Sequence, residues 1–228
     1  MKKIFIFLLA LNLLLIIPVK AEELDLAPNA KSAILIEAST GNILYEKNSH
    51  EKLPPASMTK MMSMLIILES IDKGIINWDD IVTASANASS MGGSQILLET
   101  GEEMSVSDLF KGIAVASGND AVVALAEAIA GTTSEFVNMM NERASELGLQ
   151  DTYFKNPHGL NDTNHYSSAH DMAMIAKELV KHEKVFEYTS IYEDYLRQGT
   201  NRKLWLVNTN KVVCKFYHKG SFGLYFNG

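Results

Sequence analysis

Cysteine is almost absent from this sequence, since Cys214 is the only one among 228 residues. A single cysteine excludes an internal disulfide framework. Nothing around Cys214 resembles an activating histidine or a helix start, so we expect a passive thiol. Basic residues are also few, because 20 Lys and Arg stand against 27 Asp and Glu, a net charge of −7. No basic tract interleaves with aromatic residues, which argues against nucleic acid as a partner.

Metal-ligand patterns, internal repeats and low-complexity linkers are lacking too. The six histidines are scattered and form no ligand cluster, so we expect neither a metal nor another cofactor. The composition, 47% hydrophobic and 21% charged, is that of a globular protein. Its length is enough for one sizeable core, or for one domain and part of another.

The one long apolar run lies at the N-terminus. Lys2 and Lys3 precede residues 4–17, which are apolar apart from Asn12, and residues 18–21 place small side chains at the −3 and −1 positions before a cleavage point. A bilayer span needs about 20 apolar residues, so a signal peptide over residues 1–21 is favoured over a retained anchor. No cysteine follows, which argues against a lipoprotein. We therefore expect an exported chain that works in the cell envelope, either in the periplasm or at the outer face of the membrane.

Periodicity and turn residues predict strands near both ends and helices between them. The helix starting near Ser57 is apolar on nearly every face, which is typical of a helix buried all round. Strands at both ends with helices between them predict an α+β or α/β two-layer fold with an all-helical lobe. The predicted elements are a hairpin of strands 33–37 and 43–46, helices 57–72, 105–116, 121–130, 135–147 and 167–182, a loop or short-helix region 84–101, and a strand 204–207.

The first chemical motif is Ser57-Met58-Thr59-Lys60. Serine and lysine three residues apart share one helix face, and Ser57 at a helix start lies where free N–H groups favour negative charge. Lys60 is a candidate base for Ser57 if burial keeps its amine neutral. The alternative is an N-cap serine followed by a surface lysine, and this motif alone favours that alternative.

A second motif, Ser117-Gly118-Asn119, lies between two helices of small residues. Gly118 permits a tight connection there. The Ser117 hydroxyl is a candidate proton relay between Lys60, Ser57 and a leaving group, and the Asn119 amide is a candidate for holding a substrate carbonyl and the lysine. A plain helix-loop-helix connection with an N-cap is the alternative.

The two motifs in this order match the active-site serine penicillin-recognising enzymes. Ser-Gly-Asn, where class A β-lactamases carry Ser-Asp-Asn, favours the carboxypeptidase branch. Between about residues 25 and 217 the chain resembles the low-molecular-mass D-alanyl-D-alanine carboxypeptidases, which are serine peptidases. The segments that carry this resemblance are 54–60, 92–95, 114–121, 156–160 and 207–211.

The resemblance implies a β-lactamase/transpeptidase-like fold, with a sheet flanked by helices plus an all-helical lobe. It implies that Ser57 forms an acyl-ester, Lys60 is the general base, Ser117 relays a proton and Asn119 positions substrate and lysine. The implied reaction removes the terminal D-alanine of peptidoglycan stem peptides, a step in cell wall biogenesis and cell shape. β-Lactams are then acylating inhibitors, and no metal is required.

The match fails at the family's third motif. Lys-Thr-Gly belongs shortly after Lys211, but residues 225–227 read Tyr-Phe-Asn, so the third-motif lysine is absent. We therefore expect residues 22–228 to form an incomplete peptidase domain, by frameshift or as a fragment. Its last strands, C-terminal helix, β-rich domain and the amphipathic helix that gives membrane-surface association in the full-length family are missing. Losing one oxyanion donor costs about 10²–10³ in rate, so weak or no activity is expected.

Two other functions stay open. One is a β-lactamase or esterase of the same fold, and the other is a catalytically dead remnant that binds peptidoglycan. His158, which follows a proline in the turn 156–159, has two interpretations: it lines the cleft, or it is a structural turn residue. The second is favoured by the turn chemistry.

Overall fold

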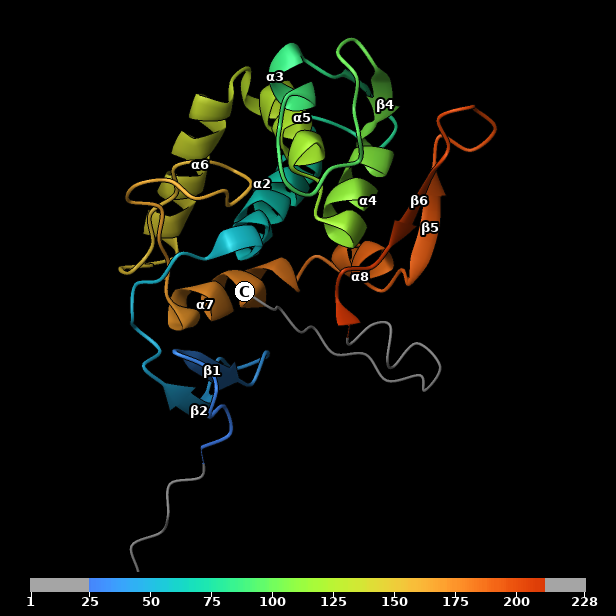
Figure 1. Ribbon diagram of the computed structural model, residues 1–228. Helices are drawn as coiled ribbons and strands as arrows, with labels where there is room; N and C mark the ends of the chain where they lie inside the picture. Colours follow the sequence, from blue (N-terminus) through green and yellow to red (C-terminus); the bar gives the residue numbers. More distant parts are fainter. Residues whose placement is uncertain (1–24, 212–228) are drawn as a thin grey trace, which may run out of the picture. The chain divides into compact units, whose positions relative to one another are not determined.

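The computed structural model describes residues 25–211 (Figure 1). The chain divides into two units between Ala30 and Lys31. In the first unit, residues 25–30 contain a turn in which the Ala30 N–H donates to the Ala27 carbonyl at 3.1 Å. The predicted signal peptide, Cys214 and the stretch at 225–227 lie outside the described residues.

The predicted N-terminal hairpin is confirmed. Strands β1 (Ala33–Ile36) and β2 (Ile43–Lys47) pair antiparallel, with Ala33 opposite Lys47. Gly41 turns the chain at φ +82°, which suits a residue without Cβ, and its N–H donates to the Glu37 carbonyl at 2.7 Å. Within residues 25–211 these two strands pair only with each other, and helix α7 (Ala169–Leu179) packs on β1.

Two further small sheets complete the strands of the described part. Strand β3 (Ile81–Thr83) pairs antiparallel with β4 (Glu103–Ser105), and β5 (Glu193–Leu196) pairs antiparallel with β6 (Leu204–Val207). Of these four strands, only β6 is predicted by the sequence. The α+β class therefore rests on three separate two-stranded sheets over residues 25–211.

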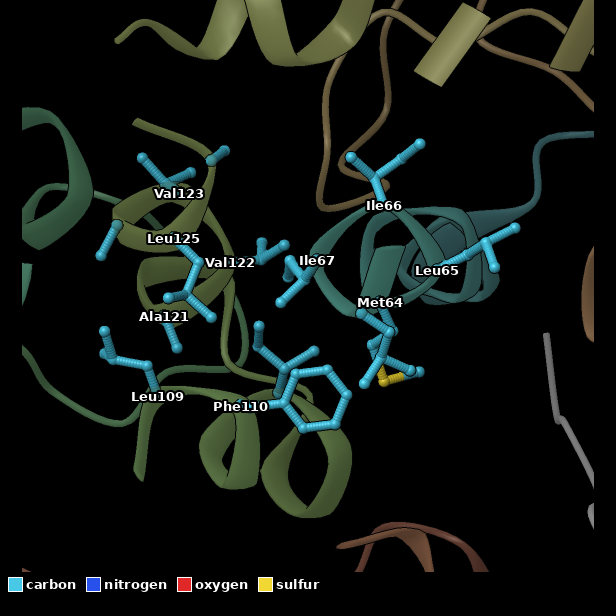
Figure 2. Close-up of a cluster of buried hydrophobic side chains, with 14 of the residues drawn as sticks. Met64, Leu65, Ile66, Ile67, Leu109, Phe110, Ala121, Val122, Val123 and Leu125 are labelled. Carbon is cyan, nitrogen blue, oxygen red and sulfur yellow. The ribbon is translucent and has the colours of Figure 1, made fainter. Parts of the chain in front are cut away.

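The central helix is α2 (Lys60–Asp72), which follows a single 3-10 turn, η1 (Ala56–Thr59). Every residue of α2 from Lys60 to Leu68 is buried. Figure 2 shows why: Ile67 points toward the side of α4 and α5, whereas Leu65 and Ile66 leave the helix in other directions. The expectation of a helix buried all round is confirmed.

Helices enclose α2 and carry the motifs. α2 packs against α5, α6 and α7, while α4 packs against α5 and α8. Side-chain caps begin four of them, because Ser85, Ser105, Thr132 and Ser168 each accept from a backbone N–H three residues on. The remaining helices are α3 (Ala86–Ser89), α4 (Val106–Ala116), α5 (Asn119–Ala130), α6 (Thr133–Glu146) and α8 (Lys184–Thr189).

Several helix boundaries differ from prediction, and two of them bear on the site or on the helix count. α5 begins at Asn119 and not at Ala121, because only Ser117 and Gly118 leave the helical conformation between α4 and α5. α7 ends at Leu179, three residues early, and the separate helix α8 follows. No helix within residues 25–211 is long and apolar enough to cross a membrane.

Candidate active site

Ser57 and Lys60 are brought together by η1 and the start of α2. The Lys60 Nζ lies 3.4 Å from the Ser57 Oγ, within hydrogen-bond reach. It also donates to the His158 carbonyl oxygen at 2.8 Å. Ser57 is in the first turn of η1, where backbone N–H groups have no acceptor within the helix. The pair has the geometry of a nucleophile beside a base.

Lys60 is buried, with 3% of its surface exposed. Burial lowers the pKa of its amine from 10.5 to about 8, while the charge of Asp120 acts in the opposite direction. A neutral fraction of lysine is therefore available near neutral pH. The alternative of a surface lysine is wrong, because the residue is buried and its amine donates to the His158 carbonyl oxygen.

Ser117 occupies a strained position at the end of α4. Its φ of 58° and ψ of 34° place it in the left-handed region, which costs a non-glycine residue about 1–3 kcal/mol. Its Oγ is buried and has no hydrogen-bond partner in the part of the chain that the structure describes. Strain and an unsatisfied hydroxyl at one residue are typical of a functional position.

Asn119 is buried at the start of α5 and has one free end. Its Nδ2 donates to the Gly92 carbonyl at 2.7 Å, and its backbone N–H donates to the Ser94 carbonyl at 2.7 Å. Its Oδ1 is buried without a partner among residues 25–211. The amide is thus fixed in orientation, with an acceptor left over for another group.

The loop at residues 94–98 is held from two sides. Asp120, 1% exposed, accepts from the N–H groups of Ile96 and Leu98, each at 3.0 Å from its nearer carboxylate oxygen. From the β5–β6 connection, Arg197 donates to the Ile96 carbonyl at 2.9 Å and pairs with Glu102. These contacts fix the loop whose Ser94 carbonyl anchors Asn119.

Two cavities open beside the nucleophile, and Ser57 and Ser94 line both. The first, about 290 Å³, also reaches Lys60 and Ser117. The second, about 410 Å³, reaches Asn119 and His158. The four candidate residues of the two motifs therefore gather around one cleft. Other side chains of the first cavity come from η1, α2, α4, α8 and the segment after β6, namely Met58, Met61, Met64, Ile113, Ala114, Thr189, Asn208, Thr209 and Asn210.

Residues 158–160, in the turn after Tyr153, line the second cavity. Asn156 Oδ1 accepts from the Gly159 N–H at 2.7 Å, which makes a tight turn. Gly159 adopts a φ of +88°, and a Cβ there would lie 1.8 Å from the Ala56 carbonyl oxygen. His158 lines the second cavity as well as shaping the turn, so interpreting it as a turn residue alone is incomplete. Burial and the neighbouring Lys60 lower the pKa of His158 to about 4.

Comparison with known proteins identifies the family of this chain. A family profile described as D-alanyl-D-alanine carboxypeptidase matches residues 19–220. The chain belongs to this family. The D-alanyl-D-alanine carboxypeptidase DacF of Bacillus subtilis is 60% identical over 193 residues, which cover 85% of this chain and 49% of that protein.

Solved structures of penicillin-binding proteins agree with the family. Penicillin binding protein 5 from Haemophilus influenzae has a TM-score of 0.77 at 33% identity, over 82% of this chain and 54% of that one. Penicillin binding protein 6B from Escherichia coli has a TM-score of 0.76 at 36% identity, over 81% and 58%. The predicted fold class is confirmed. The chain spans about half the length of the relatives that it matches.

Some residues of the candidate site in this D-alanyl-D-alanine carboxypeptidase family member cannot be found by looking for side chains that carry chemistry. Ser94 takes part through its carbonyl and by lining both cavities, and the His158 carbonyl binds Lys60. Backbone contacts of this kind leave no mark in composition or spacing. The only signal for them is that segments 92–95 and 156–160 resemble the family. Among residues 25–211, no group of three or more His, Cys, Asp or Glu side chains is placed to hold a metal ion.

Proposed function

We propose that this chain is a serine-type D-alanyl-D-alanine carboxypeptidase that works through an acyl-enzyme on Ser57. The observation that carries the proposal is the buried Lys60, whose Nζ lies 3.4 Å from the Ser57 Oγ and whose pKa is lowered to about 8. A base tuned toward the working pH beside a serine hydroxyl is what activation of this nucleophile requires.

Acylation begins when neutral Lys60 takes the proton of the Ser57 hydroxyl. The Ser57 Oγ attacks the carbonyl carbon between the last two D-alanines, and a tetrahedral oxyanion forms. N–H groups in the first turn of η1 are suited to stabilise this charge. The C–N bond then breaks, and the leaving amine needs one proton. We assign its delivery to Lys60 by way of the Ser117 hydroxyl, whose Oγ is buried and has no partner within residues 25–211.

Asn119 is assigned to substrate positioning. Its Nδ2 is held by Gly92, so its Oδ1, which has no partner in the described part of the chain, is presented as an acceptor for a backbone N–H of the stem peptide. Deacylation reverses the roles: Lys60 takes a proton from water, the hydroxide attacks the ester carbonyl, and Ser57 leaves with a proton returned by Lys60.

The proposed partners follow from this chemistry. The substrate is a peptidoglycan stem peptide ending in D-Ala-D-Ala, and β-lactams acylate the same serine. A peptidoglycan substrate requires an extracytoplasmic location, in keeping with the predicted signal peptide at residues 1–21 and a peptidase domain from residue 22 on. Membrane-surface association is assigned only to full-length members of the family.

The decisive experiment labels the purified chain with fluorescent penicillin, with Ser57→Ala as control. In parallel, release of D-alanine is measured from an N-acylated tripeptide ending in D-Ala-D-Ala. Labelling that disappears in Ser57→Ala, together with D-alanine release, supports the proposal. Absence of both in a cooperatively folded chain overturns it.

The same assay separates the two alternatives. Rapid, repeated turnover of a chromogenic β-lactam without D-alanine release indicates a β-lactamase or esterase. Binding of purified peptidoglycan by both the parent and Ser57→Ala, without labelling, indicates a non-catalytic binding protein.

A further inference from the structure

The His165 ring connects η1, which carries Ser57, to the turn whose carbonyl oxygen binds Lys60. The ring is buried, with 6% of the residue exposed, and its Nε2 lies 2.8 Å from the Thr59 Oγ1. Its Nδ1 accepts from the Lys155 backbone N–H at 3.0 Å. A backbone N–H only donates, so in this neutral ring Nε2 carries the proton and donates it to Thr59.

Both sides of the Lys60 contact are tied to this ring. Thr59 immediately precedes Lys60, so its hydroxyl fixes the backbone from which the lysine leaves. Lys155 begins the turn 155–160, in which the His158 carbonyl oxygen accepts from the Lys60 amine at 2.8 Å. We propose that His165 is a positioning residue that sets the place of Lys60 relative to Ser57 by holding the turn 155–160 on η1. This inference rests on the proposed function, in which Lys60 is the base.

The surroundings leave the ring little freedom. Phe154 packs edge-on against it, with ring centroids 5.9 Å apart. Gly159 lies so close to η1 that a Cβ would come within 3.0 Å of the Thr59 Oγ1. Burial lowers the pKa of His165, while Asp162 opposes this. A protonated ring would present Nδ1–H to the Lys155 N–H, two donors face to face, so the neutral form is the one that holds the turn.

Two substitutions divide the functions of the ring. Asn places an acceptor where Nδ1 lies, whereas Gln reaches the Nε2 position and gives up the acceptor for Lys155. We expect His165→Gln to lower the second-order rate constant of penicillin labelling, per folded molecule, by roughly 10-fold to 100-fold. His165→Asn should retain more of the rate. Thr59→Val should lower the labelling rate constant, and Thr59→Ser, which keeps the hydroxyl, should retain it. His50→Gln, at a distant surface histidine with 62% side-chain exposure, is the matched control.

A second readout does not depend on activity. In His165→Gln the turn is expected to move off Lys60 and admit water, so the Lys60 pKa, followed by NMR, should rise from about 8 toward its ordinary 10.5. Thermal melts supply the folded fraction of each variant. Parent-like labelling and an unchanged Lys60 pKa in His165→Gln would overturn the inference. A parent that is not labelled counts against the proposed function alone, since the NMR comparison still decides the role of His165.

Discussion

Lys60 lies closer to the His158 carbonyl oxygen, at 2.8 Å, than to the Ser57 Oγ, at 3.4 Å. The lysine is therefore held more closely by a turn about 100 residues further along the chain than by Ser57, which lies in the preceding 3-10 turn η1. Ser63 strengthens the same connection, because its hydroxyl donates to the Pro157 carbonyl at 2.6 Å. Reactivity at Ser57 thus depends on contacts between α2 and the turn 155–160.

The pH dependence of acylation should report Lys60. Because burial holds its pKa at about 8, the neutral base becomes more abundant as pH rises from 6 to 9. The rate of penicillin labelling should rise with a midpoint near 8 and then level off. Labelling at fixed penicillin concentration, quenched at short times, measures this. A flat profile across that range would exclude Lys60 as the base.

The free energy of unfolding should also depend on pH through Lys60, and it should increase as pH rises. The folded-state pKa of Lys60 lies below the unfolded value of 10.5, so the unfolded chain binds more protons between about pH 8 and 10.5. Burying the charged lysine costs roughly 3 kcal/mol below pH 8, and the cost disappears through that window. Lys60→Met should therefore be the more stable protein at pH 7, by roughly 2 kcal/mol after the lost hydrogen bond.

Urea melts of the parent and Lys60→Met across pH 7 to 10.5 test this linkage. The gap in free energy of unfolding should narrow as pH rises, because the parent recovers the cost of its buried charge. A gap that stays constant would show that Lys60 does not change its protonation on folding in this range.

Ser117 allows strain and chemistry to be separated. Glycine tolerates the φ of 58° that penalises alanine, so Ser117→Gly should be more stable than Ser117→Ala by about 1 kcal/mol. Both lose the hydroxyl, and both should lose D-alanine release to a similar extent. Thermal melts of Ser117→Gly and Ser117→Ala check the difference in stability, and turnover assays on the same two variants check the loss of activity. Retained turnover in either variant would remove Ser117 from the proton path.

Gly159 and Gly74 make a matched pair for the close approach at the cleft. Both have positive φ, +88° and +70°, but a Cβ at Gly74 meets nothing within 4 Å whereas one at Gly159 meets the Ala56 carbonyl oxygen. Gly74→Ala should cost about 1 kcal/mol from backbone strain alone. Gly159→Ala should cost clearly more and abolish penicillin labelling, because η1 and the turn must separate. Equal losses of stability with labelling intact would contradict this packing.

The helices were predictable because their signals are local. Ser105 and Ser168 cap α4 and α7, and the apolar sequence of α2 predicts a buried helix. The strands β3, β4 and β5 could not be predicted from the sequence. The first two have three residues each, and β5 carries the charged residues Glu193 and Asp194. Their pairing depends on partners brought together by the rest of the fold, which a window of sequence does not contain.

The site divides in the same way. Ser57, Lys60, Ser117 and Asn119 belong to spaced motifs, and the structure brings them to one cleft. The contacts that orient them use carbonyl groups of Gly92, Ser94 and His158. Every residue has a carbonyl, so residue type does not reveal which ones are used. Their catalytic roles remain predictions that the experiments above test.

The all-round burial of α2 also bears on how this protein is made. Met61, Met62, Met64, Leu65, Ile66, Ile67 and Leu68 are covered by elements that come later in the chain. Until α5, α6 and α7 dock, this stretch is an exposed hydrophobic segment that faces water on every side. Intermediates that display it are prone to aggregate. Heat inactivation should accordingly be irreversible, with an apparent Tm that rises with scan rate.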